Sequence, residues 1–314
     1  MMTIYKWENG GLKEATEFAS SCWINLVDPT TTELEAVLTH SGVPRDFLTD
    51  PLDAGERPRF DYEDDASLII VHVPRPDNDK EEVSPYRTVP LGIILFGKSV
   101  ITVCSASTPV TTAFLDQIRR VCPPSDTYRF AFRLLWHAGV LFLRYINEIH
   151  SRTAVLEDEL HESISNEVLM KLFQIEKTLV YFTTSLKADT IALARANTAR
   201  QLTLSEDDRD SLEDAMVEYQ QALETATIHS NILNGTLDTF ASIINNNLNN
   251  VMKYLTAATI MLAAPTLIAS LYGMNIGLPF QNHAHAFSIV MGFSGLLAIA
   301  IGALFVILSR KRKF

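Results

Sequence analysis

Hydrophobic and polar positions divide the chain into a densely charged part and an apolar carboxyl-terminal part. Residues 254–309 contain no Asp, Glu, Lys or Arg. Two apolar segments lie in this stretch, residues 255–272 and 287–308, and each has about the length that a helix needs to cross a bilayer. Glycine, proline and polar residues between them, in residues 276–286, indicate an exposed loop. The sequence therefore predicts a two-helix transmembrane hairpin, residues 254–314.

A long helical pattern leads into this hairpin, from residue 205 to about residue 273. It begins acidic, becomes Asn-rich and ends apolar. The basic residues 310–313 directly follow the second span, and such clusters are retained in the cytoplasm. Because two crossings return the chain to the same side, both termini are expected to be cytoplasmic in a cell (inner or plasma) membrane, with only the loop at residues 275–286 outside. The polar first eleven residues predict no secretory signal.

The charged part has the alternation of an α/β domain followed by helices. The fold class is therefore an α+β membrane protein with an amino-terminal cytosolic α/β domain. The expected parts are the α/β domain, a helical hairpin that breaks near residues 163–165, an acidic and Asn-rich stalk helix and the transmembrane domain, at residues 1–125, 126–204, 205–253 and 254–314. Strands are expected at residues 3–7, 22–27, 59–62, 67–74, 88–96 and 100–104, the first ending at a turn over residues 9–11. Helices are expected at residues 32–40, 45–50 and 109–121.

One motif matches a phosphate-binding loop by its letters alone. Residues 92–99 have the spacing of two glycines followed by Lys98 and Ser99. The phosphate-binding mechanism needs a flexible loop before a helix, whereas here an apolar β-rich run precedes another strand. We therefore expect a hairpin turn at residues 97–99.

A stripe of small and polar residues follows one face of the predicted first span and of the stalk before it. Steps of four and three residues keep one face of a helix. This polar stripe comprises Asp238, Ser242, Asn245, Asn249, Met252, Thr256, Thr259, Ala263, Thr266, Ser270 and Gly273. A small-residue packing face, or hydroxyls bonded back to their own helix, is the simpler alternative. The polar stripe runs without a break from the stalk to the outer end of the span, and this continuity favours a water-filled pore made by several copies of the helix.

Charge and isolated polar residues add less to the prediction. The 37 acidic and 26 basic residues give a net charge of −11, which argues against nucleic-acid binding and favours attraction of cations. An acidic helix start after residue 205 is usually a solvated face. His137, His150 and His161 are expected to be solvated or capping, and the three cysteines to be reduced core residues. No nucleophile, base and acid set emerges, so an enzyme is not predicted.

The sequence Tyr272-Gly273-Met274-Asn275 ends the first span, after a long helix and a cytosolic domain. In this position it resembles the CorA family, within the CorA/ZntB superfamily of divalent-cation transporters. The resemblance implies a funnel-shaped homopentamer in the lipid bilayer, with the first spans lining the pore and the second spans outside. It also implies a selectivity filter at Gly273, Met274 and Asn275.

Further roles follow only from this resemblance. Asn249, Met252, Leu255, Ala263 and Thr266 fall at the family's pore and gate positions, and Asp238 would form an acidic ring at the cytosolic mouth. Asp214 falls where a regulatory Mg²⁺ would bind between subunits, with a carboxylate from residues 77–82 of a neighbour. Asp77 and Asp79 are among the possible partners. Internal Mg²⁺ bound there would hold the pore shut.

Mg²⁺ is the expected ion, both transported and regulatory. It gives up its water reluctantly, and a ring of Asn275 amide oxygens can accept hydrogen bonds from that water without holding the ion too tightly. A membrane potential of 100 mV would supply about 4.6 kcal/mol for each divalent ion that enters.

Two alternatives stay open. The first is a ZntB-like transporter of Zn²⁺, Co²⁺ or Ni²⁺, with possible proton coupling. It follows from the absence of a carboxylate in residues 276–282 and from His283 and His285 just after them. A cytosolic binding module anchored by the hairpin is the second.

Overall fold

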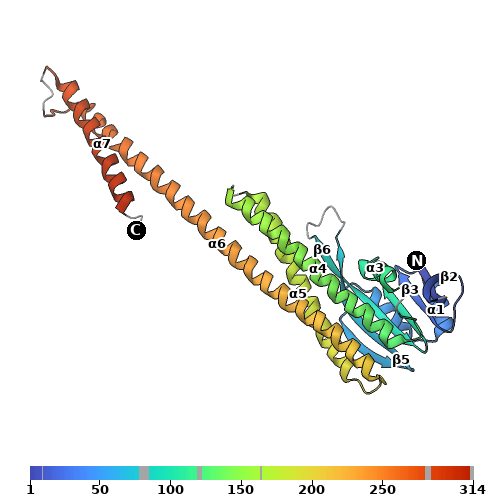
Figure 1. The fold of residues 1–314 in the computed structure, drawn as a ribbon. Coiled ribbons are helices and arrows are strands. Elements are labelled where there is room, and N and C mark those ends of the chain that lie inside the picture. Colours follow the sequence, from blue (N-terminus) through green and yellow to red (C-terminus); the bar gives the residue numbers. More distant parts are fainter. Residues whose placement is uncertain (9, 78–84, 119–121, 163–164, 280–283, 312–314) are drawn as a thin grey trace. The chain divides into compact units, whose positions relative to one another are not determined.

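The computed structural model describes residues 1–314 except 9, 78–84, 119–121, 163–164, 280–283 and 312–314 (Figure 1). The chain forms two compact units, Met1–Gly235 and Thr236–Phe314. The first holds a sheet and the helices packed on it, and the second holds two apolar helices. The finer division into four parts stays a prediction.

A seven-stranded mixed sheet forms the centre of the first unit. The strand order is β2-β1-β3-β7-β6-β5-β4, and β3 and β7 are parallel while all the other neighbours are antiparallel. The strands are β1 Met2–Glu8, β2 Gly11–Ala15, β3 Cys22–Val27, β4 Arg59–Glu63, β5 Ala66–Pro76, β6 Tyr86–Phe96 and β7 Ser99–Cys104. All six predicted strands are present. β2 was missed, because its five residues include only one large apolar side chain, Leu12, and pairing with β1 holds it in place.

Helices cover both faces of the sheet, which alternation of side chains along each strand makes possible. On one face Ile24 and Leu26 belong to the same core cluster as residues of α1 (Thr31–Ser41) and α2 (Arg45–Thr49), and a 3₁₀ turn, η1 (Asp50–Leu52), follows α2. On the other face the Trp23 ring meets Phe114 of α3 (Pro109–Ile118) and Phe130 of α4 (Thr127–Glu162). The last part of the predicted helix, residues 119–121, lies outside the described residues.

The predicted hairpin turn is confirmed, so the phosphate-loop pattern is coincidental. β6 and β7 pair antiparallel with Phe96 opposite Ser99, and Gly97 in the connection has a φ of 54°. A left-handed backbone at that position suits glycine. The residues between the two glycines of the pattern are strand residues, and no helix follows them.

Three long helices, α4, α5 (Asn166–Thr198) and α6 (Glu206–Tyr272), complete the first unit, and α6 alone among them continues into the second. Ser165 is the N-cap of α5. Both helix starts and the break before α5 agree with the predictions. Within the first unit the Phe142 ring of α4 meets Phe182 of α5 edge-on at 5.1 Å and Tyr219 of α6 at 6.3 Å. The amino-terminal third of α6 is therefore part of the core of the first unit.

The three cysteines, Cys22, Cys104 and Cys122, are buried and free. Burial raises the pKa of the Cys104 and Cys122 thiols to about 11. The prediction of unpaired core cysteines is confirmed. The prediction for His137 is wrong, because this side chain on α4 is 4% exposed and packs near Phe114. His150 stacks on another histidine, and the side chain of His161 lies outside the described part of the chain.

Candidate functional site

The two apolar helices have the length and composition of membrane spans. The carboxyl-terminal part of α6 and the helix α7 (Ala286–Lys311) each contain a stretch long and apolar enough to cross a membrane. Large apolar side chains on both helices are open, with Leu262, Leu296 and Ile299 at least 70% exposed. So much exposed apolar surface on neighbouring turns is typical of contact with lipid. The predicted pair of membrane helices is confirmed at this level.

One face of α6 packs against α7 within this second unit. The Tyr254 and Phe305 rings meet edge-on at 6.1 Å. Gly302 leaves room for the Met261 side chain, since a Cβ at residue 302 would lie 2.7 Å from the Met261 Cε. The half-buried residues on this face of α6 are Ala257, Met261, Ala264, Pro265 and Ile268.

The polar stripe lies on α6 away from that packed face. Every member of the stripe in this unit is exposed in the single chain, whereas the positions toward α7 are half-buried. The predicted pore-lining residue Leu255 is also exposed, at 60%. α7 therefore leaves the stripe uncovered and available to water or to further copies of the helix.

The threonines of the stripe bond back to their own helix. The Oγ1 atoms of Thr256, Thr259 and Thr266 donate to the carbonyls four residues earlier, at 2.8, 2.9 and 2.8 Å. This is the simpler alternative considered for the stripe, and it satisfies the hydroxyl protons in an apolar surrounding. A hydroxyl oxygen that donates in this way keeps lone pairs that can accept from water.

The Gly-Met-Asn segment directly follows the last helical residue, Tyr272. The Gly273 N–H donates to the carbonyl of Ala269 at 3.0 Å, and the Tyr272 hydroxyl donates to the carbonyl of Pro279 at 2.9 Å. Met274 and Asn275 are exposed. Helix C-termini carry carbonyls without helical partners and a partial negative charge. The arrangement places an amide side chain beside a terminus that favours cations.

The predicted regulatory carboxylates differ in their surroundings. Asp214 and Asp238 on α6 are exposed. The Asp77 carboxylate is 1% exposed and forms an ion pair with the Arg87 guanidinium, while Asp79 lies outside the described residues, as does His283. Among the described residues no three His, Cys, Asp or Glu side chains are grouped so that they could hold a metal ion. A site between subunits would need a second copy of the chain.

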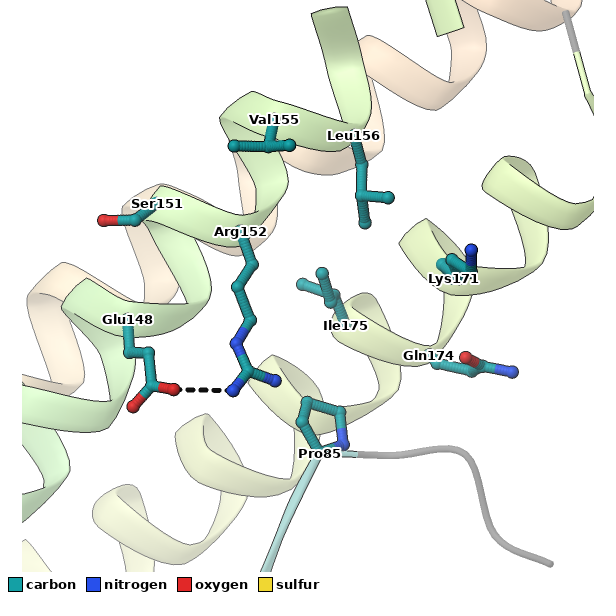
Figure 2. Close-up of a pocket in the computed structure, with 9 residues that line it drawn as sticks. All are labelled: Pro85, Glu148, Ser151, Arg152, Val155, Leu156, Lys171, Gln174 and Ile175. Carbon is teal, nitrogen blue, oxygen red and sulfur yellow. Dashed lines mark hydrogen bonds and ion pairs between the residues drawn. The ribbon is translucent and has the colours of Figure 1, made fainter. Parts of the chain in front are cut away.

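A groove of about 540 Å³ lies between α4 and α5, beside Pro85 (Figure 2). Its walls include Val155, Leu156 and Ile175. The two cationic side chains that line it already have partners, because Arg152 pairs with Glu148 at 2.6 Å and Lys171 with Glu167 at 2.8 Å. The groove therefore offers apolar surface with compensated charges, unlike the open stripe of α6.

Fold and site together define a class: a membrane protein with an amino-terminal α/β unit and two candidate spans, the first of which is the end of the long helix α6 and exposes a polar stripe. The family model described as CorA-like Mg²⁺ transporter protein matches residues 18–312. The chain belongs to the CorA family, which is a family of transporters and not a class of enzymes.

Similar proteins agree with this assignment. A cobalt/magnesium transport protein CorA from Methanocaldococcus jannaschii is 29% identical over 303 residues, 92% of this chain and 90% of that protein. The complete structure of the CorA magnesium transporter from the same organism matches with a TM-score of 0.82 at 24% identity, covering 100% of this chain and 98% of the other. The ZntB cytoplasmic domain from Vibrio parahaemolyticus matches with a TM-score of 0.56 at 14% identity, covering 79% and 98%. At these identities the two structures support the fold alone.

Proposed function

We propose that this protein carries divalent cations, with Mg²⁺ as the main ion, through a pore lined by α6 from five copies of the chain. The observation that carries the proposal is the position of the polar stripe, on the face of α6 that α7 leaves uncovered. Membership of a family of Mg²⁺ transporters supports the choice of ion, as does the cobalt/magnesium relative. In the proposed assembly the α6 helices surround the axis and α7 contacts lipid.

The selectivity filter in this proposal is Gly273, Met274 and Asn275. Five Asn275 amide oxygens would accept hydrogen bonds from the waters of a hydrated ion, so that the ion need not lose its first shell. A neutral ring binds less tightly than a ring of carboxylates would, which permits release. Below it, the pore would pass the threonine and asparagine positions of the stripe and end at Asp238, whose carboxylates would attract cations to the cytosolic mouth.

Regulation by internal Mg²⁺ is the part of the proposal that needs a neighbouring subunit. Asp214 is exposed and could contribute a carboxylate directly. Asp77 already pairs with Arg87, so its participation would require exchange of that partner or contact through a water of the ion. Asp79 remains the other proposed partner. Both chain termini would lie in the cytosol, and the membrane potential would drive entry.

Transport of Zn²⁺, Co²⁺ or Ni²⁺, with proton coupling, is the alternative. The loop after Asn275 lacks carboxylates that would collect hydrated Mg²⁺, and the fold also matches the ZntB cytoplasmic domain. An anchored binding module without transport is a weaker alternative, since an anchor gains nothing from a polar stripe along a span.

Ion entry into proteoliposomes tests the proposal. Vesicles that contain the full-length protein and a Mg²⁺-sensitive or Zn²⁺-sensitive dye would be given each ion under an inside-negative potential, at two internal pH values. We expect Mg²⁺ entry that the membrane potential drives and that persists without a proton gradient, with protein-free vesicles as the control. Zn²⁺ entry that follows the proton gradient would favour the Zn²⁺ alternative. If neither ion enters, the anchored binding module is the interpretation that remains.

A further inference from the structure

Two histidines form a direct contact between α4 and the cytosolic part of α6. The rings of His150 and His229 stack with their centroids 4.4 Å apart and their planes at 27°. His150 is exposed and His229 is half-buried, and both belong to the first unit. Histidine is the side chain whose charge normally changes between about pH 5 and 8.

The stack suits neutral rings and not charged ones. Burial, and then the charge of His150, lowers the pKa of His229. Two imidazolium rings at this separation would repel each other, because both would carry a positive charge within a few ångströms. The contact is therefore stable while at least one of the two rings is neutral.

The other charged groups on α4 near the two histidines interact with groups outside the stack. On α4, Glu148 accepts from Arg152 at 2.6 Å, as Figure 2 shows, and its pKa is lowered first by the Tyr86 hydroxyl. Arg144, also on α4, lies near His137, whose pKa is lowered first by burial and then by the Arg144 charge.

On α5, Lys171 pairs with Glu167 and the Lys177 ammonium lies 5.6 Å from the Tyr181 ring centre. Two further charged groups lie on these helices. Glu176 of α5 is half-buried, and Glu224 of α6 accepts a hydrogen bond from Gln220 at 2.9 Å. The charge that acts on the His229 pKa is that of His150, not one of these groups.

We propose that the His150–His229 stack is a proton-sensitive contact that holds α6 against α4 when the rings are neutral and weakens when both are protonated. A lowered pKa in the folded protein means that the unfolded chain binds more protons over the window between the two values. The stability from this contact is present above the ordinary histidine pKa and is lost as pH falls through the lowered pKa of His229. The consequence for transport, that acid in the cytosol alters the helix leading to the pore, rests on the proposed function.

Thermal unfolding of the full-length protein in detergent tests the contact without any measurement of transport. Trp7, Trp23 and Trp136 are the three tryptophans of the chain and all lie in the first unit, so their fluorescence reports its unfolding. The double variant His150→Phe with His229→Phe keeps two stacked rings and removes their charge. His40→Phe is the matched control, because His40 is exposed and stacks on Phe18 at 4.3 Å elsewhere in the unit.

Between about pH 8 and pH 5.5 we expect the unfolding temperature of the wild type to fall by roughly 2–4 °C more than that of the double variant. His72 and His137, whose pKa values burial lowers, contribute a fall that all the variants share. His40→Phe should behave like the wild type. The proposal is overturned if the unfolding temperature of the double variant falls as much as that of the wild type. It is also overturned if His40→Phe reduces this fall as much as the double variant does.

Ion entry at internal pH values of about 7.5 and 6 then tests the consequence separately. A pH effect on entry that the double variant lacks would support it. Equal pH effects in wild type and double variant, with the difference in unfolding temperature present, would limit the contact to stability. Absence of entry in all variants would contradict the proposed function and leave the result for the contact unchanged.

Discussion

Replacement of Asn275 by alanine is expected to slow Mg²⁺ entry strongly while the protein stays folded. Asn275 is exposed just after the end of α6, so its loss removes amide oxygens without disturbing a packed core. Each hydrogen bond lost to a charged hydrate contributes about 1.5–3 kcal/mol, which predicts a decrease of roughly tenfold or more in initial entry rate. The measurement is dye-reported Mg²⁺ entry into proteoliposomes with equal amounts of protein.

Asn231→Ala provides the matched control for this prediction. Asn231 is also exposed on α6, but it lies in the first unit, about two turns before Asp238, the first residue of the polar stripe, and its replacement should leave entry unchanged. Asn275→Asp should distinguish a neutral filter from a charged one, since a carboxylate ring would bind Mg²⁺ more tightly and slow its release. Normal entry through Asn275→Ala would refute the proposed filter.

Gly92→Ala is expected to destabilise the first unit more than any exposed substitution of equal size. Gly92 lies on β6 inside the sheet, and a Cβ there would come within 2.3 Å of the Pro51 Cγ and 2.9 Å of its Cβ. Pro51 is a buried ring in η1 that has no rotamer with which to move away. Such overpacking typically costs about 1–3 kcal/mol, so near the upper value the unfolding temperature should fall by roughly 6–12 °C.

The same added methyl group at Gly235 provides the comparison. Nothing lies within 4 Å of a Cβ at that helical position, so Gly235→Ala should be neutral or slightly stabilising. Tryptophan fluorescence during heating again reports the first unit. A stable Gly92→Ala variant would show that η1 can move away from β6, contrary to the packing described above.

Local pattern was sufficient to predict most of the elements. The charge-free stretch and its two apolar segments gave the membrane helices, and continuous helical periodicity gave α6 within a residue of each end. The two-residue connection at Gly97 followed from strands on both sides. The strand β2 was not predicted, because pairing with β1 and not its own composition stabilises it.

Interactions between residues distant in the chain could not be predicted in the same way. Asp189 on α5 reads as an ordinary helix-surface carboxylate, yet it is fully buried and accepts from the backbone N–H of His72, 117 residues earlier, at 2.7 Å. Burial raises its pKa well above the usual range. The Asp77–Arg87 ion pair and the stacking of His150 on His229 likewise depend on tertiary packing, and the sequence held no spacing that would indicate either.

Polar positions along the span illustrate the remaining difficulty. Periodicity placed Thr256, Thr259 and Thr266 on one face, and α7 does leave that face uncovered. Whether a face of this kind contacts water depends on other copies of the chain, because a single hairpin buries too little surface to define a pore.

The buried cysteines allow local unfolding of the first unit to be followed by thiol modification. A thiol reacts as its thiolate, and burial together with a pKa of about 11 leaves Cys104 and Cys122 almost without thiolate at neutral pH. Modification must therefore wait until the surrounding structure opens. Because Cys104 ends a central strand and Cys122 precedes α4, their separate reaction rates distinguish opening of the sheet from detachment of the helices. The chain thus carries two built-in reporters of local unfolding, and new cysteines can be introduced for labelling without removing the native ones.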